Sequence, residues 1–223
     1  MLYCGLDIGS TNIKVVLAEE NGHSCWVKAV ATPRRHDGIG IATDAAALVA
    51  QLEDMIIEGW RAVGGGKPLA AIAATGVGED GVNADAALKP LGLAIPWFDK
   101  RALTELDEFA AAYALTRVTF YTTATKWMWL RRHRSAEIGA GKLWIALTEY
   151  ASSLWCGEPF MSETIAARTG CYDVFARCWV DGALAFCQAP TLPRVLKAGE
   201  AAGTVRGGRL CQAGAADGST VIA

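Results

Sequence analysis

The chain has 223 residues, of which 52% are hydrophobic and 20% charged, and it contains 8 Trp. This apolar content is enough for a buried core, which excludes a chain that is disordered throughout. The formal charge is −2, from 21 basic and 23 acidic residues, so no basic excess is available to neutralise a phosphate backbone. No apolar run approaches the roughly 18 residues that span a bilayer. We therefore expect one large or two small folded domains, with no nucleic-acid or membrane partner.

The Cys and His content restricts metal chemistry. The three His and the absence of any Cys-x-x-Cys pair leave no zinc-type motif. Asp7 interrupts the only apolar stretch near the N-terminus, so no signal peptide is predicted. We expect reduced, mostly buried thiols in a cytoplasmic protein, at Cys4, Cys25, Cys156, Cys171, Cys178, Cys187 and Cys211.

The N-terminal thirty residues predict three consecutive strands. Apolar and β-branched runs place them at residues 2–8, 12–18 and 24–32, and Asn21-Gly22 marks a tight turn. Because the connections are short, the strands should form an antiparallel meander. This arrangement differs from the strand-helix-strand opening of many nucleotide-binding folds.

A helix should follow, with Thr43 as its N-cap and Asp44 in its first turn. Apolar residues recur at helical spacing as far as Val63, and the glycines at 64–66 should end the helix. The segment 64–67 has the sequence Gly-Gly-Gly-Lys but is no Walker P-loop. The Walker spacing would need Gly at position 61 and Ser or Thr at position 68, where the chain has Arg61 and Pro68.

The rest of the chain alternates between strand and helix patterns. Strands are expected at 69–74 and 143–147, and helices at 102–115, 126–134 and 148–155, with a loop-rich stretch at 76–99. Residues 159–189 show no single pattern. The last residues, 218–223, predict a turn and the start of a strand.

The segment from Gly5 to Lys14 is the strongest candidate for ligand binding. A strand delivers Asp7 to its end, and Gly9, Ser10 and Thr11 then form a tight turn. Small residues allow backbone N–H groups to approach an anion, and hydroxyls add further donors. A carboxylate beside such a turn can hold Mg²⁺, which bridges to phosphate oxygens. The spacing fits an ordinary polar hairpin equally well.

A second candidate site combines the segments 75–81 and 96–101. The first can present Glu79 and Asp80 at a cleft, and the second contains Trp97 and Asp99. Carboxylates accept hydrogen bonds from sugar hydroxyls, and a Trp face packs against sugar C–H groups, so the combination suits a polyol. The alternative is a surface loop in which Trp97 fills the core and Asp99 pairs with Arg101.

The only basic cluster lies at residues 126–134. It could bind an anionic partner. A helix with an apolar face and a solvated basic C-terminal end explains the same residues, and the overall negative charge favours this second interpretation.

Taken together, these segments resemble the N-terminal domain of the FGGY family of carbohydrate kinases, which belongs to the actin-like ATPase superfamily. The opening DIGSTNIK resembles the family's first phosphate motif. TGVGEDG and WFDKRA resemble its sugar-contacting segments, and TTATKWMWLRRH its Thr-x-x-Lys-x-x-Trp-Leu helix start. LTEYASSLWCGEP and SETIAARTGCYDVFARCWV are similar to the stretch that follows. The resemblance covers essentially the whole chain. It implies an α/β fold with a ribonuclease-H-like core, a mixed sheet and helices on both faces.

The resemblance also implies roles for single residues. Asp7 matches the Asp that faces the metal and the phosphates, with Mg²⁺ held through water. The remaining nucleotide contacts would come from Gly9, Ser10, Thr11, Asn12 and Lys14. The substrate contacts would be Glu79, Asp80, Trp97, Asp99 and Tyr121. Gly78 departs from the pattern, because some members have Arg or Met there, which puts one sugar contact in doubt.

The function implied is transfer of the ATP γ-phosphoryl group to a hydroxyl of a sugar or polyol. In the family, the strand similar to 219–223 continues to a Gly-Gly-x-Asp segment whose Asp is the general base. That Asp is expected beyond Ala223, and so is a C-terminal nucleotide-binding domain. The chain 1–223 is therefore expected to be an N-terminal sugar-binding domain without turnover of its own, and the intact protein is expected to be a homodimer.

Two other functions remain open at this point. The first is a non-catalytic sugar-binding or regulatory module, which a natural stop at residue 223 would favour. The second is an ATPase domain of the actin or chaperone type, against which the sugar-contacting segments argue.

Overall fold

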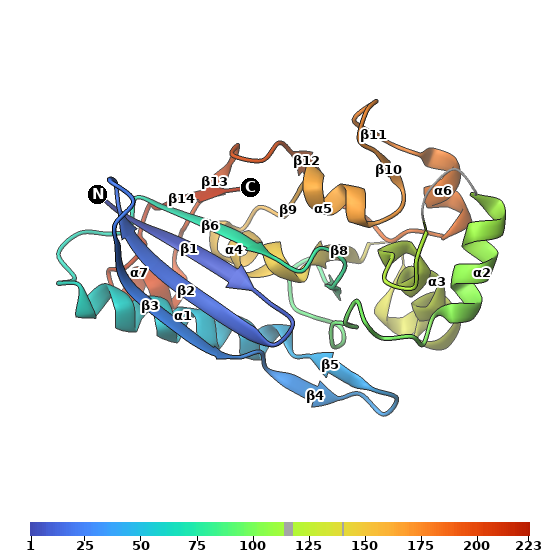
Figure 1. The fold of residues 1–223 in the computed structure, drawn as a ribbon, viewed down its shortest axis with the longest axis horizontal. Helices are drawn as coiled ribbons and strands as arrows, with labels where there is room; N and C mark the ends of the chain where they lie inside the picture. Colours follow the sequence, from blue (N-terminus) through green and yellow to red (C-terminus); the bar gives the residue numbers. More distant parts are fainter. Residues whose placement is uncertain (114–117, 140) are drawn as a thin grey trace.

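A six-stranded mixed sheet forms one half of the molecule, as the computed structural model shows for residues 1–113, 118–139 and 141–223 (Figure 1). Its strand order is β13-β14-β6-β1-β2-β3. The strands are β1 (Leu2–Ile8), β2 (Asn12–Glu19), β3 (Ser24–Ala31), β6 (Ala71–Gly76), β13 (Ala201–Thr204) and β14 (Thr220–Ile222). The first three pair antiparallel, which confirms the predicted meander, whereas β6 runs parallel to β1 and β14 runs parallel to β6.

Helices cover one face of this sheet. Helix α1 (Ala45–Ala62) packs on β2 and β3, α4 (Leu147–Cys156) packs on β6 and β1, and α1 also contacts α4 and α7 (Gly208–Gln212). Side chains that alternate along β1 and β2, such as Leu6 and Val15, are almost fully buried beneath them. The intervening side chains, such as Lys14 on β2, are exposed, and so is Val27 on the neighbouring β3. Helices were predicted on both faces of the sheet, and in the described residues they cover one face.

The start of α1 differs by one residue from the prediction. Thr43 belongs to a short hairpin of β4 (Arg34–His36) and β5 (Ile41–Thr43), which the sequence analysis did not identify. Asp44 is the N-cap instead, and its side chain accepts a hydrogen bond from the Ala47 N–H at 3.1 Å. At the other end, the Gly64 N–H bonds to the Arg61 carbonyl, so the glycine run is a helix terminus, as predicted.

The second half of the molecule is mainly helical and has its own hydrophobic core. Its helices are α2 (Leu103–Ala112), α3 (Thr123–His133), the 3₁₀ turn η1 (Ser135–Glu137), α5 (Glu163–Arg168) and α6 (Asp181–Phe186). Short strands pair as β7 (Gly81–Ala84) with β8 (Leu143–Ala146), β9 (Phe160–Ser162) with β12 (Arg194–Leu196), and β10 (Tyr172–Asp173) with β11 (Cys178–Trp179). Phe109, Trp127 and Trp144 lie in this core.

The predicted helices exist, with shifted ends. Helix α3 begins three residues before position 126, and α2 covers most of 102–115, of which residues 114 and 115 lie outside the described residues. Strand β7 falls within the stretch 76–99, which was expected to be loop. It pairs with β8, far along the chain, and this pairing has no local signal.

The β4–β5 hairpin connects the two halves. Its turn residue Asp37 receives hydrogen bonds from Arg101, at 2.6 Å, and pairs with Arg134 at 3.0 Å. The side chains of Asp37 and Arg101 are each only 3% exposed. Burial by itself raises the pKa of Asp37, but the Arg101 and backbone hydrogen bonds outweigh it, so the pKa lies well below its usual range. The hairpin is thus held on the helical half by a buried ion cluster.

Within the described residues, no helix is both long and apolar enough to cross a bilayer. No three His, Cys, Asp or Glu side chains of these residues converge on a possible metal position. All seven Cys are free. The predicted burial is confirmed for Cys4, Cys156, Cys171 and Cys187, whereas Cys178 is exposed.

Candidate functional site

The turn between β1 and β2 exposes a carboxylate and an ammonium side by side. Asp7 and Lys14 face each other in the strand register, and their Oδ2 and Nζ atoms lie 2.8 Å apart. Both side chains are accessible, at 40% and 52% exposure. The turn needs glycine at position 9, because a Cβ there would lie 2.6 Å from the Asn12 carbonyl oxygen.

The tip of this turn is fixed through its carbonyl groups. The Thr32 hydroxyl donates to the Gly9 carbonyl at 2.7 Å, and Arg34 donates to the Ser10 carbonyl at 2.5 Å. Among the described residues, no acceptor is bonded to the N–H groups of Ser10 and Thr11. Two backbone donors beside an accessible carboxylate therefore face solvent from a fixed tip, with the exposed Asn12 next to them.

The sheet places Asp7 beside a second loop. In the parallel register of β1 and β6, Asp7 lies opposite Thr75. The chain then passes close against β1, where the Val77 N–H donates to the Ile8 carbonyl at 3.0 Å. Gly76 has a φ of 152°, and a Cβ there would collide with the Ile8 carbonyl oxygen. The Gly-rich loop that leads to Glu79 therefore begins next to the Asp7 turn.

An open cavity of about 620 Å³ lies beside this loop. It is lined by Thr75, Gly76, Val77, Gly78, Glu79, Trp97, Tyr121, Thr164, Ile165 and Arg168. The structure thus brings three predicted substrate-binding residues together: Glu79, Trp97 and Tyr121. Glu79 is paired with the Arg168 guanidinium, which also lies 5.6 Å from the Tyr121 ring centre.

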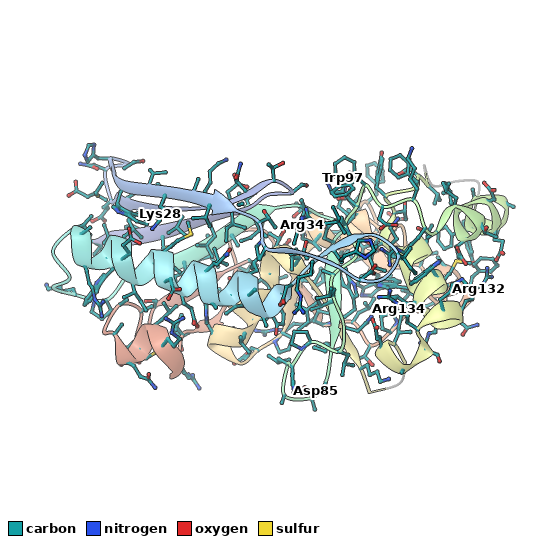
Figure 2. All side chains as sticks on the ribbon, turned by 90° about the horizontal axis from the view of Figure 1, so that it is seen from below. Lys28, Arg34, Asp85, Trp97, Arg132 and Arg134 are labelled. Atoms are coloured by element: carbon teal, nitrogen blue, oxygen red, sulfur yellow. The ribbon has the colours of Figure 1, made fainter. Side chains whose placement is uncertain are left out.

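Trp97 connects the cavity with the turn. Its indole Nε1–H donates to the Ser10 hydroxyl at 2.8 Å, and its ring makes an edge contact with Tyr121 at 6.3 Å between centroids. Figure 2 shows Trp97 and Arg34 near the junction of the sheet half and the helical half. The two candidate sites of the sequence analysis are therefore parts of one site.

Two other predicted substrate contacts do not line the cavity. Asp80 is 1% exposed, and its Oδ1 accepts a hydrogen bond from the Trp97 backbone N–H at 2.6 Å. Burial raises the pKa of Asp80 to about 7. Asp99 is bound to Arg101 through its carboxylate oxygens, at 2.9 and 2.7 Å. Both carboxylates thus have partners within the fold, and the Asp99–Arg101 ion pair of the alternative interpretation is present, whereas Trp97 lines the cavity and does not fill the core.

Lys126 supports the loops rather than binding an anion. It is buried, and its Nζ donates to the carbonyls of Asp99, at 2.7 Å, and Phe120, at 2.5 Å. Burial lowers the pKa of Lys126 to about 8. It therefore ties the loop of Trp97 to the loop of Tyr121. The predicted solvated end of this helix is confirmed only for later residues, such as Arg132, which pairs with Glu105 and Glu108.

Two polar cavity residues had no role in the sequence analysis: Thr164 and Arg168. Thr75 opens the candidate segment 75–81, directly after the predicted strand at 69–74, but had no role of its own. Arg168 lies in the segment SETIAARTG, which was matched as a whole without a function for any single residue. Its proximity to Glu79, 89 residues away, follows only from the fold.

The model of the N-terminal domain of the FGGY family of carbohydrate kinases matches residues 2–223. The chain belongs to this family. The FGGY domain here is 24% identical over 223 residues to a xylulose kinase of Klebsiella pneumoniae, covering 92% of this chain and 44% of that protein. The chain thus spans less than half the length of this relative.

Solved structures agree with the FGGY assignment at the level of the fold. The xylulose kinase of Rhodospirillum rubrum superposes with a TM-score of 0.89 at 22% identity, over 100% of this chain and 48% of that one. The gluconate kinase of Lactobacillus acidophilus superposes with a TM-score of 0.87 at 18% identity, over 99% and 47%. The predicted actin-like fold is therefore confirmed, with the sheet and helices described above.

Proposed function

We propose that this FGGY domain is the sugar-binding half of an ATP-dependent sugar kinase, which transfers a phosphoryl group to a sugar or polyol hydroxyl. One observation carries the proposal: the Trp97–Ser10 hydrogen bond joins a polar cavity to a turn with free backbone donors. A kinase needs the acceptor hydroxyl and the transferred phosphoryl group within one site, held in line. The xylulose kinase relative supports a sugar substrate.

The residues of the turn fit a nucleotide phosphate with its metal. The free N–H groups of Ser10 and Thr11 and the ammonium of Lys14 suit phosphate oxygens. The accessible Asp7 carboxylate suits Mg²⁺, and since no three His, Cys, Asp or Glu of the described residues converge on a metal position, water would complete the coordination. Bound ATP and Mg²⁺ would supply the phosphoryl group and neutralise its charge. Gly9 and Asn12 shape the turn, because the Gly9 N–H donates to the Asn12 carbonyl at 3.0 Å.

The residues of the cavity suit the sugar. Glu79 can accept hydrogen bonds from hydroxyls, and the rings of Trp97 and Tyr121 provide apolar walls for sugar C–H groups. Asp80 and Lys126 contribute from behind, by holding the backbone of the Trp97 loop. The site is therefore built to orient a small polyol beside the turn.

A general base is missing from the described cavity. Among the described lining residues Glu79 is the only carboxylate, and its Oε1 is already paired with the Arg168 guanidinium. We place the base in the part of the protein beyond Ala223, and we expect the 223-residue chain alone to have no turnover.

The test is an ADP-release assay with D-xylulose, glycerol and D-gluconate. It compares the 223-residue chain with the product of its reading frame expressed to the natural stop codon. Sugar-dependent ADP release by the longer product and none by the chain is the expected result. Turnover by the chain alone would contradict the placement of the base. No turnover by either protein would favour the non-catalytic sugar-binding module. A cytoplasmic location and a homodimer of the intact protein stay predictions.

A further inference from the structure

Arg168 lines the same cavity as the Gly-rich loop but belongs to another element. It is the last residue of α5, and its side chain is 51% exposed although it forms an ion pair. Its Nε donates to Glu79 Oε1 at 2.8 Å, Nη2 donates to the same oxygen, and the guanidinium lies over the Tyr121 ring. Contacts on two sides therefore hold an accessible guanidinium in one orientation.

The pair retains unused hydrogen-bonding capacity that faces the cavity. Both bonds from Arg168 end on Glu79 Oε1, and among the described residues neither Glu79 Oε2 nor Arg168 Nη1 has a hydrogen-bond partner. A guanidinium has five N–H donors, so most of them are free. One acceptor and several donors are thus presented next to each other, which matches two neighbouring hydroxyls of one ligand.

Gly78 makes room for this arrangement. A Cβ at position 78 would lie 2.7 Å from the Arg168 Cγ and 3.4 Å from its Cβ. The φ angle of Gly78 is not positive, so an alanine would suit the backbone there. Glycine is therefore needed here only because the Arg168 side chain occupies the place of a Cβ, and any side chain at this position must displace Arg168.

The charge of the cavity limits the ligand. Among the described residues that line it, Glu79 and Arg168 alone are charged, and they neutralise each other. A ligand carboxylate beside Glu79 would have no second cation to compensate it. An uncharged polyol suits a neutral donor–acceptor pair.

We propose that Arg168 contacts the substrate directly: with Glu79 it binds two adjacent hydroxyls of an uncharged polyol, in a position that Gly78 leaves open. This inference rests on the proposed sugar site and assigns its specificity to a residue of α5. It predicts that residues 78 and 168 are coupled, although they lie on different elements.

The test measures binding of glycerol, D-xylulose, D-glucitol and D-gluconate to the chain by calorimetry, together with the NMR signal of the Arg168 Nε–H. Arg168→Gln should weaken polyol binding at least tenfold, and so should Gly78→Ala. The double variant should bind no more than twofold worse than either single one, because both changes remove the same contact. Gly78→Ala should also shift the Arg168 Nε–H signal without ligand. D-Gluconate should bind at least tenfold more weakly than D-glucitol, from which it differs at one carbon.

Arg177→Gln is the matched control, because Arg177 makes the same kind of pair with Glu163 outside the cavity. It should leave polyol binding within twofold.

If the wild-type chain binds no polyol, the proposed function fails and the inference fails with it. If the chain binds a polyol and folded Arg168→Gln binds it equally well, only the inference is overturned. Tighter binding of D-gluconate than of D-glucitol would overturn the uncharged ligand class. If Arg168→Gln does not fold, Arg168→Lys and Gly78→Ala decide the same question.

Discussion

The two parts of the candidate site are built in different ways. The turn at residues 7–14 is made by one hairpin, whose register and backbone hydrogen bonds are local. The cavity is assembled from four segments, at residues 75–79, 97, 121 and 164–168. Because loop closure must bring such distant segments together, the cavity depends on contacts elsewhere in the fold in a way that the turn does not.

Those contacts are buried polar groups. The Trp97 loop is held by Asp80 and Lys126 from within, and it is joined to the β4–β5 hairpin through Arg101 and Asp37. Substitutions in this support should unfold or loosen the cavity, whereas substitutions in the turn should leave the fold intact.

Arg101→Gln should have the largest effect. It removes the buried partner of Asp37 and Asp99, and breaking a buried ion pair on one side costs about 3–5 kcal/mol. Urea unfolding followed by circular dichroism measures the loss, and polyol affinity should fall in parallel. Arg177→Gln, which breaks an exposed Arg–Glu pair, is the control and should change the unfolding free energy little. Equal losses in both variants would show that the cluster does not support the cavity.

Asp80→Asn should change how stability depends on pH. Burial raises the pKa of Asp80 to about 7 in the folded state, so the folded chain binds a proton that the unfolded chain has lost between pH 4 and pH 7. The stability contributed by Asp80 is therefore complete below pH 4 and lost as the pH rises through 7. Each unit of pKa shift corresponds to about 1.4 kcal/mol, so the wild type should lose about 4 kcal/mol relative to the variant between pH 4 and pH 8.

Urea midpoints of both proteins across this pH range measure that difference, and the other titrating groups cancel because the two chains share them. Asn keeps an oxygen to accept the Trp97 N–H. Parallel pH curves for the two proteins would show that Asp80 is ionised in the fold with its ordinary pKa.

Prediction from sequence succeeded where the structure depends on local apolar patterns. The meander and α1 follow from such patterns, and the side chains buried in the sheet half agree with them. Asp80 and Asp99 have the same residue type as ligand-binding carboxylates, and nothing in the sequence distinguishes a carboxylate that faces the cavity from one that holds a loop. Only the burial of Asp80 and the Asp99–Arg101 pair make this distinction.

Trp97→Phe should cost about 1 kcal/mol of unfolding free energy, because it removes the indole hydrogen bond to Ser10 and leaves the edge contact with Tyr121 largely in place. Polyol affinity should fall severalfold, since the loop is no longer tied to the turn. Trp60→Phe is the matched control: its indole donates to the Lys67 carbonyl at 2.8 Å, far from the cavity. It should cost similar stability and leave affinity unchanged. Loss of affinity in both variants would contradict a specific role for the Trp97–Ser10 bond.

Position 168 shows the remaining limit of prediction from sequence. Arg168 meets Glu79 across 89 residues, through the pairing of short strands that carry no periodic signal of their own. The β4–β5 hairpin was missed for a related reason. Its strands have three residues each, and its turn residue Asp37 pairs with Arg101 and Arg134, which lie far along the chain.

Asp7→Asn should have the smallest effect on folding, because its pair with Lys14 is exposed and such pairs contribute less than about 1 kcal/mol. Its effect on ligand binding should be specific to the metal. Calorimetric titration of the chain with ATP, with and without Mg²⁺, should show that Mg²⁺ raises affinity in the wild type and not in Asp7→Asn. Lys14→Gln should instead weaken ATP binding by a similar factor in both conditions, because it removes charge from the phosphate side. A variant Asp7→Asn that keeps the full Mg²⁺ enhancement would place the metal elsewhere, and the turn would then be a phosphate site alone.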